Sequence, residues 1–263
     1  MVYQRYRRHR WALRSRWANH RSYLIANRFH PERAPVDAET ELAIEGFPRS
    51  ANTFATVAFQ ISQPQPVRLA HHLHAPSQII ATVRAGKPAV VLVRHPRDAA
   101  VSLVIRAPHI TMSLALAGYG RFYAPLRPFS AGFVVAQFDD VVVDFGSVVR
   151  DMNDRFNTKY SPFVPSPERV AEVYRLIDEQ SAHVPWEREL REYVSGRITR
   201  SALDSARGQT AGPLAVTQTR VARPSSERNA RSVELVREYE APGLADARRR
   251  AESLYCEFCG YGR

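Results

Sequence analysis

The chain has 263 residues, of which 44% are hydrophobic and 24% charged, a composition typical of one ordinary globular domain with a substantial core. No apolar run is long enough to cross a bilayer and the N-terminal stretch has no apolar signal core, so we expect a cytoplasmic protein without a membrane span. The net charge of +11 comes almost entirely from arginine, because Lys87 and Lys159 are the only lysines. Cys256 and Cys259 form a single Cys-x-x-Cys, which is half of a zinc site, so we expect free thiols in a reducing compartment and no metal.

The first 35 residues are predicted to form a basic arm or helix ahead of an α/β domain at 36–263. Residues 1–33 hold nine arginines against Glu32 alone, a net charge of +8. Tyr6, Leu13, Trp17 and Leu24 recur near helical spacing, which indicates a basic amphipathic helix. We favour a helix that packs on the domain through this stripe; a weak membrane-surface contact and a nucleic-acid arm are the alternatives, and no specific nucleic acid is expected.

The segment 41–59 predicts an anion site. It reads as an apolar strand from Leu42 to Phe47, a tight turn, and a helix from Asn52. The first N–H groups of such a helix have no partner inside it and point into the turn, where Arg49 adds a guanidinium. Ser50, Asn52 and Thr53 add short polar side chains. The Gly-x-x-x-x-Gly-Lys-Ser/Thr phosphate loop is absent.

Further strands are predicted at 67–70, 89–93 and 133–138, separated by helices at 76–85, around 99–103 and at 148–157. This alternation predicts an α/β fold with three α/β/α layers and a mainly parallel central sheet, like that of P-loop NTPases. Four polar residues follow the four strands in turn, at the edge where ligands bind in such sheets: Arg49, His74, Arg94 and Asp139.

The rest of the chain carries no motif. Residues 106–132 predict a short helix and a long loop over the site, and residues 197–223 predict a loop. Helices are expected at 167–179, 186–194, 225–240 and 246–256, after a linker at 158–166.

Two motifs resemble those of the sulfotransferases that use 3′-phosphoadenosine 5′-phosphosulfate (PAPS). Phe47-Pro-Arg-Ser-Ala-Asn-Thr-Phe54 is similar to the family's 5′-phosphosulfate loop, Tyr/Phe-Pro-Lys-Ser-Gly-Thr-Thr-Trp/Phe, with Arg49, Ala51 and Asn52 as departures. Arg94-His-Pro-Arg-Asp-Ala-Ala-Val-Ser102 matches the family's 3′-phosphate segment, Arg-x-Pro-x-Asp-x-x-x-Ser, without a gap. The resemblance covers about residues 41–140.

The resemblance implies PAPS as the donor, no metal, and a hydroxyl of a small molecule or sugar as the acceptor. It implies that residues 50–54 bind the 5′-phosphate, with backbone N–H groups of Ser50 to Thr53 as donors, and that Arg94 and Ser102 bind the 3′-phosphate. A late Arg-Lys-Gly loop of the family is missing, and Arg228 or Arg231 could replace it.

The family also has a catalytic histidine between the two motifs. His74-Ala75-Pro76 fits its His-x-Pro spacing, so the resemblance implies His74 as general base, with His72 as runner-up and His71 outside catalysis. Arg49 stands where the family has lysine, and it would act on the leaving oxygen through its charge.

Three other interpretations stay open at this point. The chain could be a nucleotide-binding, kinase-like protein of related fold, a non-enzymatic nucleic-acid binder, or an inactive sulfotransferase homologue. The acceptor would be selected by 106–132 and 197–223.

Overall fold

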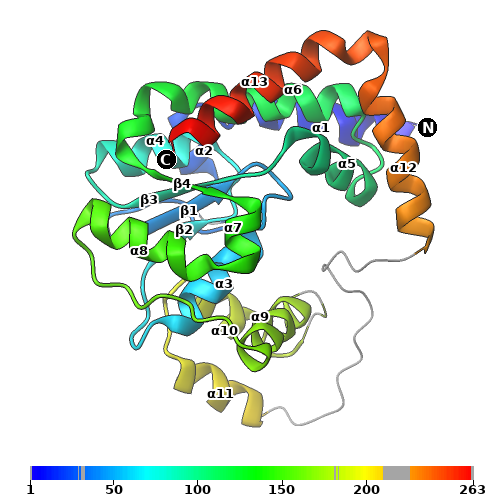
Figure 1. The fold of residues 1–263 in the computed structure, drawn as a ribbon. Coiled ribbons are helices and arrows are strands. Elements are labelled where there is room, and N and C mark those ends of the chain that lie inside the picture. The colour runs from blue at the N-terminus through cyan, green and yellow to red at the C-terminus, as the bar shows by residue number, and fades with distance from the viewer. Residues whose placement is uncertain are drawn as a thin grey trace.

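The computed structural model describes residues 2–28, 30, 33–180, 182, 184–209 and 226–261. Its centre is a parallel sheet of four strands in the order β2-β1-β3-β4 (Figure 1). The strands are β1 (Leu42–Gly46), β2 (Leu69–His71), β3 (Ala89–Val93) and β4 (Val134–Gln137), and all three neighbouring pairs run parallel. The predicted strands are therefore confirmed, with ends that differ by one or two residues.

Alternate residues of the strands face two separate cores. Leu42 and Ile44 of β1 join a core with side chains of α3, α8, α9 and α10, whereas Ala43 joins a core with α5, α6 and α13. Every residue of β1, β2 and β3 is buried, as expected for a parallel sheet covered on both faces. The predicted α/β fold with three layers is confirmed (Figure 1).

The helices begin where the sequence offers a cap or a proline. Ser166 accepts a hydrogen bond from the Arg169 N–H at the start of α9, and Thr111 does the same for Leu114 in α6. Prolines occupy the first turn of α4, α5 and α9. The helices are α1 (Val2–Trp17), α2 (Arg21–Ala26), α3 (Asn52–Ser62), α4 (Pro76–Arg84), α5 (Pro96–Arg106), α6 (Met112–Tyr123), α7 (Phe138–Val143), α8 (Phe145–Phe156), α9 (Pro167–Glu179), α10 (Glu187–Val194), α11 (Arg200–Gln209), α12 (Ser226–Glu240) and α13 (Ala245–Tyr261), with 3-10 helices at Ala124–Gly132 and Pro242–Leu244.

Two predicted loops are largely helical where they are described. The short helix predicted within 106–132 is present as α6, but residues 124–132 form a 3-10 helix in place of a loop, and the apolar residues of this stretch pack on α5 and α13. Residues 200–209 form α11, a polar helix with Leu203 as its buried residue. Residues 210–223 of the second predicted loop lie outside the described residues.

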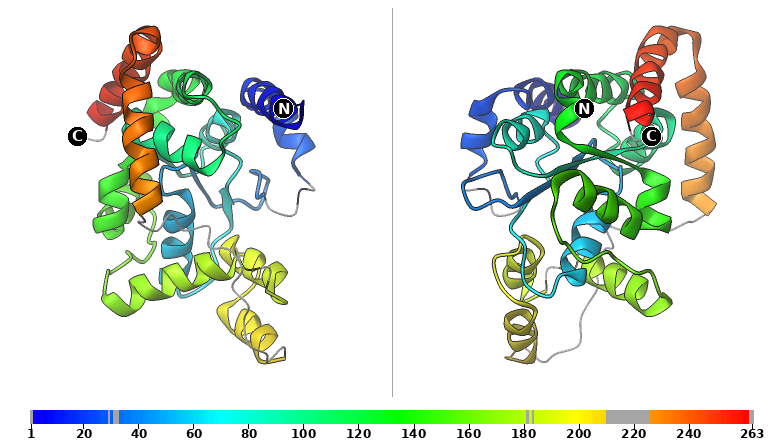
Figure 2. Two further views of the ribbon diagram at one scale, coloured as in Figure 1. Left: turned by 90° about the vertical axis from the view of Figure 1, so that its right-hand side faces the viewer. Right: turned by 60° about the vertical axis from the view of Figure 1, so that its left-hand side comes forward.

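The N-terminal helices lie on one side of the molecule and α12 with α13 on the other, while α9, α10 and α11 gather at one end (Figure 2). The predicted packing stripe of α1 is wrong, since Tyr6, Leu13 and Trp17 are exposed. The helix packs instead through Trp11, which lies against Gly118 of α6. No helix in the described part of the chain is long and apolar enough to cross a membrane. A domain boundary at residue 35 stays a prediction.

Candidate active site

The turn after β1 closes on itself and starts α3. The Ser50 N–H and the Asn52 side-chain amide both donate to the Phe47 carbonyl, at 3.2 and 3.1 Å. Arg49 and Ala51 adopt left-handed backbone angles, with φ of 76° and 64°. Gly46 is required at the end of the strand, because a Cβ there would lie 2.6 Å from the Leu92 carbonyl oxygen. The N-terminus of α3 is thereby held at the mouth of the turn, without a capping side chain of its own.

A cavity of about 880 Å³ opens above this turn and the carboxyl edge of the sheet. Ten of the twelve predicted site residues line it: Arg49, Ala51, Asn52, Thr53, Phe54, His72, His74, Arg94, Ser102 and Arg228. The two that do not are Ser50, which is fully buried and uses its N–H within the turn, and Arg231. Arg231 forms an ion pair with Glu234 on the exposed face of α12.

Three arginines from distant parts of the chain are linked by hydrogen bonds, two of them through one hydroxyl. Ser102 Oγ accepts hydrogen bonds from Arg49 Nε at 3.1 Å and from Arg228 Nη2 at 3.4 Å. Arg94 Nη1 donates to the Arg49 carbonyl at 3.0 Å, and its guanidinium lies over the Phe138 ring, 3.9 Å from the centroid. The two matched motifs, which are separate in sequence, therefore face the same space.

Positive charge accumulates here without matching acids in the turn. Burial first, and then the charges of Arg228, Arg106 and Arg94, together lower the pKa of Arg49 to about 10. Burial also lowers the pKa of Arg94, while Asp98 and Asp139 raise it. Among the described residues, Arg94 Nε is buried with no hydrogen-bond partner. Clustered guanidiniums that remain protonated at neutral pH, with an unused buried donor, fit a ligand with more than one phosphate group.

His74 presents one ring nitrogen as a base. Its Nδ1 lies 2.9 Å from the Gly46 carbonyl oxygen, which can only accept, so Nδ1 carries the proton and Nε2 keeps its lone pair. Within the described part of the chain, Nε2 makes no hydrogen bond. Burial, then the nearby His72, lowers the pKa of His74 to about 3, so the ring is neutral at physiological pH.

His72 is engaged on both sides of its ring. Nε2 lies 3.0 Å from Thr53 Oγ1, and Nδ1 lies 2.6 Å from His71 Nδ1. His71 Nε2 in turn lies 3.0 Å from Ser195 Oγ, and burial holds the pKa of His71 well below its usual value. This chain of contacts joins β2 to α3 and to the end of α10, so the geometry favours His74 over His72 as the base.

The sequence did not predict the wall of the cavity opposite the turn. This wall is formed mainly by α9 and α10, while the ranges 106–132 and 197–223 contribute only Arg106 and Arg197 among the described residues. The wall residues of α9, α10 and their connection are Tyr174, Ile177, Gln180, Glu187, Arg188, Arg191, Glu192 and Val194. The sequence of these helices is typical of surface helices, with i,i+4 ion pairs on α10. It contains no motif that indicates a cavity.

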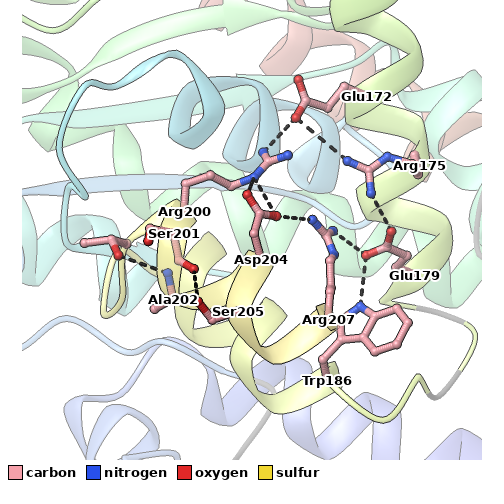
Figure 3. Close-up of polar contacts among 11 residues, drawn as sticks. Glu172, Arg175, Glu179, Trp186, Arg200, Ser201, Ala202, Asp204, Ser205 and Arg207 are labelled. Carbon is pink, nitrogen blue, oxygen red and sulfur yellow. Dashed lines mark hydrogen bonds and ion pairs between the residues drawn. The ribbon is translucent and has the colours of Figure 1, made fainter. Parts of the chain in front are cut away.

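A buried carboxylate fixes this wall (Figure 3). Glu179 accepts from Arg175 at 2.7 Å, from Arg207 at 2.5 Å and from Trp186 Nε1 at 3.2 Å. Arg200 of α11 pairs with Glu172 of α9 at 2.7 Å. These contacts join α9, the start of α10 and α11, in addition to their apolar packing.

The remaining predicted features do not line the cavity. Asp139 and Asp140 open α7, next to Phe138. Cys256 and Cys259 form no disulfide, and Cys259 Sγ donates to Gln137 Oε1 at 3.4 Å. No group of three or more metal-ligating side chains occurs in the described ranges.

No family model matches this chain, and no curated protein matches it in sequence. Among solved structures, its fold is similar to that of mouse sulfotransferase SULT7A1 complexed with PAP. The match covers 89% of this chain and 93% of that one, at 13% identity and a TM-score of 0.39. This is a distant likeness of fold, and the function proposed below rests on the site itself.

Proposed function

We propose that this protein is a sulfotransferase that moves a sulfuryl group from PAPS to a hydroxyl of a small molecule or sugar. The observation that carries the proposal is the meeting of Arg49 and Arg228 at Ser102, with Arg94 bonded to the Arg49 carbonyl, in the same cavity as His74 and the N-terminus of α3. A cytoplasmic location stays a prediction from the sequence.

The donor's two phosphate groups fit two parts of the arginine cluster. Arg94, Ser102 and Arg228 would bind the 3′-phosphate, and Arg94 Nε supplies a buried donor that still lacks an acceptor. The N–H groups at the start of α3 would bind the 5′-phosphate, because a helix N-terminus favours anions. The Ser50 N–H is not one of them, since it already donates to Phe47.

The transfer needs positioning, one base and a positive charge at the leaving oxygen. His74 Nε2 takes the proton of the acceptor hydroxyl while that oxygen forms a bond to sulfur. The bond from sulfur to the bridging oxygen breaks, and its electron pair stays on the 5′-phosphate of the departing adenosine 3′,5′-bisphosphate (PAP). Arg49 remains charged at neutral pH and stabilises this developing negative charge.

Calorimetric titration with PAP tests the donor site without knowledge of the acceptor. Loss of a charge-assisted contact costs about 1.5–3 kcal/mol, so Arg94→Ala should weaken PAP binding roughly 10- to 150-fold. Arg231→Ala removes an arginine of the same helix as Arg228 but outside the cavity, and it should change the affinity less than about twofold. Absence of heat with the full chain would refute the proposal.

Turnover is tested with labelled PAPS and a panel of hydroxylated acceptors, with and without a metal chelator. His74→Ala should lower kcat by roughly 100-fold or more at unchanged PAP affinity. Tight PAP binding without transfer to any acceptor would favour an inactive homologue. Transfer that needs a divalent metal and ATP would favour the kinase-like alternative.

A further inference from the structure

Helix α1 leaves most of its large apolar side chains exposed to solvent. Its inner side carries Trp11, which packs on α6, and Ser15, whose Oγ accepts from Arg121 at 3.0 Å. At roughly 100° per residue, Tyr6, Leu13 and Trp17 fall within about 40° of one another and about opposite Ser15. Their exposed fractions are 59%, 63% and 44%.

Helix α2 adds another exposed apolar residue. Ile25 is 72% exposed, whereas Tyr23 of the same helix is buried and accepts a hydrogen bond from Arg14 Nε at 2.6 Å, which joins α2 to α1. Several exposed large apolar side chains on two neighbouring helices are unusual for a surface that faces only water.

The same two helices carry dense positive charge. Residues 2–28 contain eight arginines and no acid. Arg10 lies among the apolar residues of α1, and Arg5 and Arg16 border them; all three are exposed. The positive charge therefore favours an anionic partner. The exposed apolar side chains favour a partner with an apolar medium in which leucine and isoleucine can be buried.

We propose that the outer face of α1 and α2, defined by Tyr6, Leu13, Trp17, Ile25 and the arginines at 5, 10 and 16, binds the surface of an anionic phospholipid bilayer. Tyrosine and tryptophan are favoured at the level of lipid headgroups, leucine and isoleucine enter the acyl boundary, and arginines contact lipid phosphates. A nucleic acid would match the arginines but offers no apolar medium for Leu13 and Ile25.

This face is separate from the proposed catalytic cavity, so the two functions can be tested independently. None of its residues lines the 880 Å³ cavity. The contact between α1 and the site comes from Arg14, which is not one of these residues: its Nη2 donates to the Leu73 carbonyl at 3.4 Å, next to His74.

Sedimentation of the full chain with vesicles tests the proposal. The protein should bind vesicles of phosphatidylcholine that contain about 30% phosphatidylserine, which imitates the negative charge of an anionic leaflet. It should not bind vesicles of phosphatidylcholine alone. Each of Arg5→Gln, Arg10→Gln and Arg16→Gln should lower the partition coefficient about fivefold, and each of Leu13→Ser and Ile25→Ser roughly tenfold. A control with three exposed arginines elsewhere, Arg150→Gln, Arg249→Gln and Arg250→Gln, should lower it far less.

Tryptophan fluorescence gives a second readout that does not depend on sedimentation. Anionic vesicles should shift the emission to shorter wavelength, and Trp17→Phe should abolish the shift, because Trp11 and Trp186 face the interior. PAP affinity should stay unchanged in every variant, which verifies the fold.

Three results would overturn the proposal. The first is equal binding to both kinds of vesicle or to neither. The second is a loss in the charge control as large as in the arginine variants of α1. The third is tighter binding to a duplex or single-stranded oligonucleotide that Leu13→Ser and Ile25→Ser leave unchanged, which would assign the face to nucleic acid.

Discussion

Replacing Ala51 with glycine should not destabilise the protein, although glycine usually does. Ala51 has φ 64° and ψ 21°, the left-handed region, which costs an L-residue roughly 1–2 kcal/mol. Glycine removes this strain, but it adds about 0.4–1 kcal/mol of unfolded-state entropy and loses part of one methyl contact. The expected net change in the free energy of unfolding lies between a loss of about 0.4 kcal/mol and a gain of about 1 kcal/mol, centred on a slight gain.

The matched control is Ala55→Gly, one turn further along α3. Ala55 is fully buried in an ordinary helical conformation, so glycine should cost about 1 kcal/mol in helix propensity and about 0.8 kcal/mol in lost burial. Urea denaturation should therefore separate the two variants by about 2 kcal/mol. If Ala51→Gly is destabilised as much as Ala55→Gly, the left-handed strain assigned to the turn is wrong.

Three further outcomes follow from single contacts. Burial raises the pKa of Glu45 from 4.5 to about 8, so between these pH values the folded state retains a proton that the unfolded chain has released. The resulting stabilisation is complete below pH 4.5 and is lost as the pH rises through 8, a decline on the order of a few kcal/mol. Glu45→Gln should flatten this decline in urea denaturation measured at several pH values. Gly118→Ala places a Cβ 2.3 Å from Trp11 Cη2 and should cost about 1–3 kcal/mol, with partial recovery when Trp11→Leu is added. Glu179→Gln removes the buried carboxylate that pairs with the half-exposed Arg175 and the partly buried Arg207, and it should cost about 1.5–3 kcal/mol by thermal or urea unfolding, against less than about 0.5 kcal/mol for the exposed Glu234→Gln.

The donor half of the candidate site could be predicted from the sequence because its information is local. A strand, a turn and a helix start are encoded within residues 41–59, and parallel strands bring their carboxyl ends to one edge. Arg49, His74 and Arg94 each lie within three residues of the end of a strand, so their placement at one edge followed from the strand pattern and the fold class.

The opposite wall could not be predicted because its information is not local. Residues of α9 and α10 look like ordinary surface helices until Glu179 collects donors from α9, α10 and α11. The sequence could not choose between Arg228 and Arg231 for the same reason. The two residues are three positions apart on α12, and the packing of α12 on α5 determines that Arg228 is the one that reaches Ser102.

The prediction that the stripe of α1 packs on the domain was wrong for a related reason. Helical spacing shows which residues share a side, but it does not say whether that side packs or remains exposed. The single residue Trp11 decided the orientation, because Gly118 leaves room for its ring on α6. Periodicity therefore found the stripe of Tyr6, Leu13 and Trp17 correctly and assigned it to the interior incorrectly.

Backbone strain in the described residues is concentrated where the function is proposed. Five non-glycine residues have positive φ, and four of them line the cavity: Arg49, Ala51, His72 and His74. Such conformations persist only when their surroundings hold them. Glu45, buried in the middle of the sheet, accepts the N–H groups of Leu73 and His74 at 2.6 and 2.9 Å, and Gln78 adds a third donor at 2.8 Å. The strand that leads into the turn at 47–51 therefore also fixes the histidine segment, so one carboxyl group holds His74 in register with that turn.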